Sequence, residues 1–78
     1  MNKQAQEYLR YFYQEAYKFD ESTGIMAYYD HQEYNGNWVM FVRRNDNRRS
    51  YIECEGPKEA YSIMHSINMG IAFANNRF

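Results

Sequence analysis

The sequence predicts a two-layer α+β domain with the order α-β-β-β-α, in which a three-stranded antiparallel sheet carries both helices on one face. Three observations lead to this fold class. The N-terminal segment has a helical apolar period, a turn signal at Asn35 and Gly36 separates two β-rich segments, and a second helical period follows Pro57. At 78 residues the chain is expected to form one domain, residues 1–78, with a thin core.

The first helix is predicted from Asn2 to Phe19, because apolar residues recur there at steps of three and four. Tyr11 and Tyr17 fall outside this stripe and are expected to be exposed. Gly24 supplies the turn that ends the segment. The stripe consists of Ala5, Tyr8, Leu9, Phe12, Ala16 and Phe19.

The next two segments are predicted to form a hairpin. The chain from Ile25 to Tyr34 is rich in β-branched and aromatic residues, and Asn-Gly favours a two-residue type I′ turn. Such a tight turn places Trp38 opposite Glu33 and Phe41 opposite Asp30.

A third strand is predicted in the segment SYIECE, after the turn RRNDNRR. A loop of three or five residues places Ile52 and Cys54 on the sheet face of Met40 and Val42. We prefer this register because the alternative buries Tyr51 with Glu53. A slip of one residue would send each side chain to the opposite face.

The second helix is predicted from Pro57 to about Asn75, since proline is favoured in a first helical turn. Gly70 lies at the edge of its apolar stripe and is expected to permit close contact between helices. The stripe consists of Ala60, Ile63, Met64, Ile67, Ile71 and Ala74.

The sheet face away from the helices is the predicted contact surface. In the preferred register it carries an aromatic platform with one guanidinium, and an apolar patch with a charged rim is typical of a binding site. Cross-strand pairs that only stabilise the sheet, or a different register, are the alternatives. The platform residues are Tyr28, Val39, Phe41, Arg43 and Tyr51, and the same face is expected to carry Asp30, Gln32, Tyr34, Glu53 and Glu55.

The arginine-rich turn has three interpretations. The predicted charged edge consists of Arg44, Arg48 and Arg49. It can bind the carboxylates of an acidic protein partner or the phosphates of a nucleic acid. Alternatively, it is a solvated strand end whose charges resist aggregation. The acidic residues on the platform face repel phosphates, which favours a protein partner.

Composition and motif content bear on other classes of function. The net charge of −1 provides no general field for a polyanion. His31, His65 and Cys54 match no zinc spacing, and Cys54 alternates with Ile52 like a core thiol. We therefore expect no metal, no cofactor and no enzymatic activity. The N-terminal segment lacks a secretory signal pattern and the apolar runs are short, so no membrane contact and a cytoplasmic location are expected.

Two resemblances extend this interpretation. The element order, with CEGPKEA leading into the last helix, resembles the double-stranded RNA-binding domain in topology and length over nearly the whole chain. That family has several lysines at the start of its final helix, where this chain has only Lys58. In size, tyrosine and asparagine content and absence of catalytic motifs, the chain also resembles small accessory proteins of bacteriophages and mobile elements, many of which inhibit host proteins, including defence nucleases.

The sequence therefore predicts a non-enzymatic protein-binding module, such as an inhibitor or modulator of a host protein with an anti-defence role. The alternative is an RNA- or DNA-binding domain that uses the aromatic face and the arginine turn. A homodimer that covers its own sheet face is a third hypothesis, in which Tyr34 and Val39 are buried by the second copy.

Overall fold

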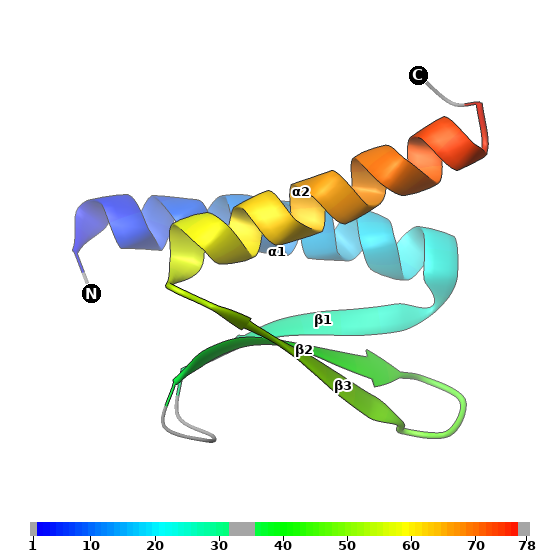
Figure 1. Ribbon diagram of the computed structural model, residues 1–78, viewed down its shortest axis with the longest axis horizontal. Helices are drawn as coiled ribbons and strands as arrows, with labels where there is room; N and C mark the ends of the chain where they lie inside the picture. Colours follow the sequence, from blue (N-terminus) through cyan, green and yellow to red (C-terminus); the bar gives the residue numbers. More distant parts are fainter. Residues whose placement is uncertain (1, 32–35, 77–78) are drawn as a thin grey trace.

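The structure is a computed structural model that describes residues 2–31 and 36–76, and it confirms the α-β-β-β-α order. The elements are α1 (Lys3–Thr23), β1 (Ile25–Asp30), β2 (Asn37–Arg43), β3 (Arg49–Cys54) and α2 (Pro57–Ala74). Both helices lie on one face of an antiparallel sheet with the strand order β1-β2-β3 (Figure 1). The predicted α+β class is correct.

Helix α1 begins and ends with clear capping interactions. The Asn2 side chain accepts a hydrogen bond from the Ala5 N–H at 2.7 Å, which satisfies one of the free donors of the first turn. The helix continues one turn beyond the predicted end at Phe19. It stops at Gly24, whose φ of 72° is in the left-handed region that favours glycine.

Helix α2 begins at Pro57, as predicted, and presents Ala60 and Met64 to the core with no exposed surface. The interpretation of Gly70 is wrong. A methyl group on Gly70 would meet no atom within 4 Å, so this glycine does not mediate a close contact between helices.

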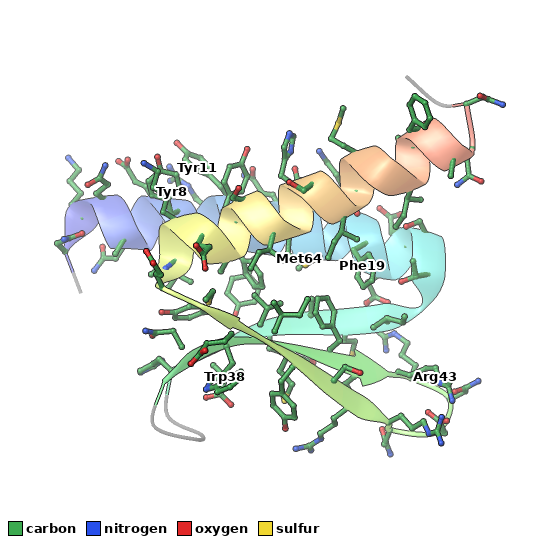
Figure 2. The ribbon with its side chains drawn as sticks, in the orientation of Figure 1. Tyr8, Tyr11, Phe19, Trp38, Arg43 and Met64 are labelled. Carbon is green, nitrogen blue, oxygen red and sulfur yellow. The ribbon has the colours of Figure 1, made fainter. Side chains whose placement is uncertain are left out.

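The core lies between the helix layer and the sheet, where Figure 2 shows Phe19 and Met64 pointing toward the strands. Phe19 and Phe41 pack edge to face, with ring centroids 5.7 Å apart. The buried apolar residues in contact with one another are Phe12, Ala16, Phe19, Ala27, Val39, Phe41, Cys54, Ala60 and Met64.

The register of β1 and β2 differs from the prediction by three positions. Trp38 pairs with Asp30 instead of Glu33, and Phe41 pairs with Ala27. This pairing leaves a longer connection than a two-residue turn, so the predicted tight hairpin is wrong. Residues 32–35, and with them the expected positions of Gln32, Tyr34 and Asn35, lie outside the described residues.

The loop between β2 and β3 also differs from the prediction in length. The Arg43 N–H donates to the Arg48 carbonyl at 2.9 Å, which leaves four loop residues, 44–47, instead of three or five. Asn47 takes a positive φ of 58° there and donates its N–H to the Arg43 carbonyl at 2.8 Å. Asparagine tolerates this conformation better than most residues.

The changed β1–β2 register and the changed β2–β3 loop length together turn β2 over relative to the prediction, while β1 and β3 keep their predicted faces. Val39 is opposite Ile52 and faces the helices, while Met40 is opposite Tyr51 on the outer face. The two shifts cancel between the outer strands, so Tyr28 and Tyr51 share the outer face as predicted.

Candidate functional site

A row of large side chains crosses the outer face of the sheet. Tyr28 pairs with Met40, and Met40 pairs with Tyr51, so the three residues lie side by side on neighbouring strands. Tyr28 is 40% exposed, although it lies on a strand. The row therefore places two of the predicted platform residues, Tyr28 and Tyr51, on either side of Met40.

Tyr28 also lines a groove of about 220 Å³ between α1 and β1. The groove is rimmed by two further tyrosines of α1, Tyr13 and Tyr17, which are 43% and 67% exposed. Its lining consists of Tyr13, Ala16, Tyr17, Asp20, Met26, Ala27, Tyr28 and Arg44. Three exposed tyrosines from two elements thus surround one depression.

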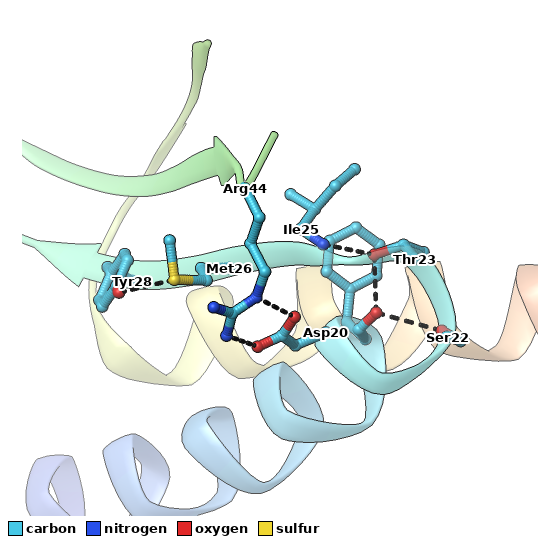
Figure 3. Close-up of polar contacts among 8 residues, drawn as sticks. Asp20, Ser22, Thr23, Ile25, Met26, Tyr28 and Arg44 are labelled. Atoms are coloured by element: carbon cyan, nitrogen blue, oxygen red, sulfur yellow. Dashed lines mark hydrogen bonds and ion pairs between the residues drawn. The ribbon is translucent and has the colours of Figure 1, made fainter. Parts of the chain in front are cut away.

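An ion pair between two lining residues of this groove, Arg44 and Asp20, is shown in Figure 3. The Arg44 Nε and Nη2 atoms donate to the two Asp20 carboxylate oxygens at 3.0 and 2.6 Å, a bidentate arrangement that fixes both side chains. The hydrogen bond from Arg44 holds the pKa of Asp20 below its ordinary value. Beside it, the Tyr28 hydroxyl donates to the Met26 sulfur at 3.3 Å.

Two backbone N–H groups on the outer edge of β1 donate hydrogen bonds to side chains of α1. The Tyr29 N–H donates to the Tyr13 hydroxyl at 3.1 Å, and the Ile25 N–H donates to Thr23 Oγ1 at 3.1 Å. The exposed edge of a sheet can pair with another chain, and side chains that cover its donors oppose such pairing. The hydrogen bond from β1 also fixes the position of Tyr13 at the groove.

The predicted platform is only partly correct. Tyr28 and Tyr51 lie on the outer face, but Val39 and Phe41 are buried in the core, with 0% and 8% of their surface exposed. Because β2 is inverted, the predicted platform residue Arg43 also lies on the helix side of the sheet, and Met40 is the β2 residue between Tyr28 and Tyr51. The hypothesis that a second copy covers Val39 on the outer face is wrong for the same reason.

Sequence reasoning missed several groove residues. The sequence pattern does not indicate that Met26 and Tyr13 line a groove, and for Tyr17 it predicts only exposure to solvent. The helical period does separate Tyr13 and Tyr17 from the core stripe of α1. Only the packing of α1 against β1, however, brings them next to Tyr28.

The arginines of the β2–β3 turn do not form one free cationic edge. Arg43 forms an ion pair with Asp46, and hydrogen bonding from Arg43 lowers the pKa of Asp46 to about 2. Arg48 Nε lies 4.0 Å from the same carboxylate. Arg44 is held by Asp20, so two carboxylates offset part of the positive charge.

Arg49 differs from the other three arginines. It begins β3 and is exposed. Within residues 2–31 and 36–76 it has no ion-pair partner, whereas the other three arginines contact Asp20 or Asp46.

A second aromatic cluster lies on the helix layer, where Figure 2 labels Tyr8 and Tyr11. Tyr8, Tyr11 and Tyr61 have ring centroids 6.0–6.1 Å apart, and Tyr61 stacks on His65 at 5.6 Å. Because these rings pack against one another, they stabilise the helix pair and offer less free surface than the groove tyrosines.

The residues considered for metal binding or nucleophilic catalysis have aromatic or core neighbours. His31 stacks on Tyr29 and His65 on Tyr61, while Cys54 is buried and burial raises the pKa of its thiol. Cys54 is thus a core thiol, as expected. Among the described residues, no three His, Cys, Asp or Glu side chains are grouped so that they could hold a metal ion.

Fold and groove together define a small α+β domain with a tyrosine-lined depression beside an aromatic sheet face. No protein-family model, curated protein or solved structure matches the chain. In the part of the chain that the structure describes, neither helix is long and apolar enough to cross a membrane.

Proposed function

We propose that the chain is a non-enzymatic protein-binding module that contacts its partner through the groove and the adjoining sheet row. This tyrosine surface comprises Tyr13, Tyr17, Tyr28, Met40 and Tyr51. The observation that carries the proposal is the convergence of three exposed tyrosines from α1 and β1 on one groove.

The chemistry of the tyrosine surface supports a protein partner. Tyrosine offers a large apolar ring with a polar hydroxyl, and such residues dominate the binding energy of many protein interfaces. Methionine adapts its shape to the partner. The Arg44–Asp20 pair adds a polar rim whose geometry is already set before binding.

The kind of partner is part of the proposal. The likeness in size and composition to small accessory proteins of phages and mobile elements favours a host protein, with inhibition or modulation, including an anti-defence role, as the outcome. A groove of about 220 Å³ suits one or two side chains of such a partner rather than a free metabolite.

The test compares two double variants in affinity purification with quantitative mass spectrometry, from a lysate of the organism in which the chain acts. Tyr17→Ala with Tyr28→Ala truncates the exposed rim of the groove. Met69→Ala with Phe73→Ala truncates residues on α2 that are 53% and 69% exposed. A partner retained by the control pair and lost by the groove pair supports the proposal, and equal recovery by both contradicts it.

Nucleic-acid binding is the second candidate, and the exposure of Arg48 and Arg49 favours it. The Arg48 side chain is 79% exposed, while Arg49 has no ion-pair partner among the described residues. A gel-shift assay with single- and double-stranded DNA and RNA across a salt series tests this candidate, because phosphate contacts give a steep salt dependence. Arg48→Gln with Arg49→Gln should abolish any shift. A wild-type chain that shifts no probe at low salt excludes this function.

A further inference from the structure

The outer edge of β3 is the open edge of this sheet. In an antiparallel ladder, successive residues direct their N–H and C=O groups alternately toward and away from the neighbouring strand. The hydrogen bond from Arg43 to Arg48 sets this alternation, so Arg49, Tyr51 and Glu53 direct theirs away from β2. Among the described residues, no strand pairs with this edge.

The two edges of the sheet differ in how far the rest of the chain covers them. At β1, hydroxyl groups of α1 accept hydrogen bonds from two outward donors, those of Ile25 and Tyr29. At β3, most residues are exposed, including Ile52 at 41%. An exposed edge with an apolar side chain is a template for a further strand.

We propose that a second copy of this chain pairs with β3 antiparallel, about a two-fold axis at Tyr51. Tyr51 then faces Tyr51 of the second copy, and Arg49 faces Glu53 of the second copy on both sides of the axis. The outward N–H and C=O groups of Arg49, Tyr51 and Glu53 exchange backbone hydrogen bonds across the axis. The result is a continuous six-stranded sheet, formed by an isologous contact.

The charges on β3 favour this register. Arg49 and Glu53 lie on the same sheet face, two positions on either side of Tyr51, and both are exposed. Neither has an ion-pair partner within the described residues. Antiparallel pairing brings opposite charges together twice, whereas parallel pairing in register would place each charge next to its like.

The other sheet face gains apolar contact. In the same register Ile52 faces Ser50 of the second copy, and the two Ile52 side chains become diagonal neighbours. The exposed part of Ile52 is then shielded from water. This contact explains an isoleucine that lies on the helix side of the sheet and yet remains 41% exposed in the single chain.

The pairing also extends the outer face of the sheet. The row Tyr28, Met40 and Tyr51 continues directly into the same row of the second copy, because paired residues project to one side. Self-association goes beyond the proposed function and stands without it, since it depends on β3 alone. Its measurement, the oligomeric state, is separate from partner capture.

Sedimentation velocity across a concentration series tests the pairing. An edge contact buries less surface than a standard interface, so we expect a dissociation constant of the dimer on the order of micromolar. Glu53→Arg and Arg49→Glu each turn two attractive contacts into repulsive ones and should weaken the dimer by about tenfold or more. A wild-type chain that stays monomeric throughout the series overturns the proposal, as does a dimer that neither reversal weakens.

Two further samples separate specific pairing from general charge effects. The double variant Arg49→Glu with Glu53→Arg restores opposite charges across the axis and should dimerise like the wild type. An equimolar mixture of the two single variants should form heterodimers, since one copy supplies both acids and the other both bases. Failure of both samples to associate overturns the register.

Cross-linking tests the position of the axis. Tyr51→Cys places two thiols opposite each other, at a Cα separation of about 5.5 Å that suits a disulfide. Arg49→Cys places its thiol four positions from its counterpart and serves as the matched control. Under mild oxidation only Tyr51→Cys should yield a covalent dimer on a non-reducing gel. The reverse pattern, or equal yields, contradicts an axis at Tyr51.

Discussion

The Asn68 side-chain amide donates hydrogen bonds to both the carbonyl oxygen of Glu15, at 2.8 Å, and its carboxylate Oε1, at 3.0 Å. These residues are 53 positions apart and join the middle of α2 to the middle of α1. Glu15 is only 7% exposed, and its carboxylate also contacts Lys18 at 3.2 Å and His65 at 3.5 Å. A buried carboxylate with several partners fixes the position of the helices relative to each other.

Asn68→Ala should destabilise the protein by about 1–3 kcal/mol, because it leaves a buried carboxylate oxygen and a carbonyl without their donor. Chemical denaturation measures the free energy of unfolding. Ser66→Ala, at an exposed position of the same helix, is the control and should change stability by less than about 0.5 kcal/mol. Equal effects of the two changes would refute a structural role for Asn68.

The stability of the protein should fall as the pH falls below the ordinary carboxyl range. Burial raises the pKa of Glu15, but hydrogen bonds from Asn68 and Lys18 and the charges of Lys18 and His65 outweigh it, so the pKa is below its ordinary value of 4.5. A lowered pKa in the folded state stabilises the fold above the pKa of the unfolded chain. This contribution is lost as the pH falls through the folded-state pKa.

Glu15→Gln removes this titrating group, so its unfolding free energy should depend less on pH than that of the wild type. Urea denaturation from neutral pH to about pH 3 measures, for each protein, the slope of the unfolding free energy against pH. The carboxylates of Asp20 and Asp46, whose pKa values are also lowered, remain in both proteins and cancel in the comparison. Parallel slopes would show that Glu15 makes no such contribution.

Phe41→Ala should cost about 3–5 kcal/mol of stability, because Phe41 fills the core against Phe19. Met40→Ala, one residue earlier on the outer face, should cost clearly less. Thermal or chemical denaturation of both variants checks the orientation of β2. If Met40→Ala were the more damaging change, the central strand would face the other way.

Tyr13→Phe should expose the Tyr29 amide to exchange with solvent. The Tyr13 hydroxyl is the acceptor for that N–H at 3.1 Å, and the phenylalanine ring keeps the packing while removing the acceptor. Hydrogen exchange followed by NMR should detect faster exchange at Tyr29. Tyr17→Phe is the control, since the Tyr17 side chain is 67% exposed, and exchange at Tyr29 should not respond to it.

Two glycines should respond in opposite directions to alanine. Gly70→Ala should stabilise the protein by about 0.5–1 kcal/mol, because the position is exposed, helical and open to a methyl group. Gly24→Ala should destabilise it by about 1–2 kcal/mol, because φ is +72° there. Thermal unfolding midpoints should therefore move apart, and a shift of both in one direction would contradict this account.

The sequence by itself determined the order of elements and which stripe of each helix faces the core, although Ala74, at the end of the predicted α2 stripe, is exposed. Helical periodicity is local, so Phe12, Ala16 and Phe19 could be assigned to the core of α1 without knowledge of its neighbours. The third strand was oriented correctly for a similar reason, since Tyr51 and Glu53 alternate with Ile52 and Cys54.

Only the tertiary structure decided which way β2 faces. Its central segment, WVMFV at residues 38–42, is apolar throughout, so no alternation distinguishes its two faces. The orientation depends on loop lengths on both sides, and one residue inverts the whole strand. The groove likewise depends on packing, because Tyr13 and Tyr17 meet Tyr28 only where α1 lies against the edge of β1. Contacts between distant segments, such as the ion pair of Arg44 with Asp20, cannot be predicted from the residues that surround either partner in the sequence.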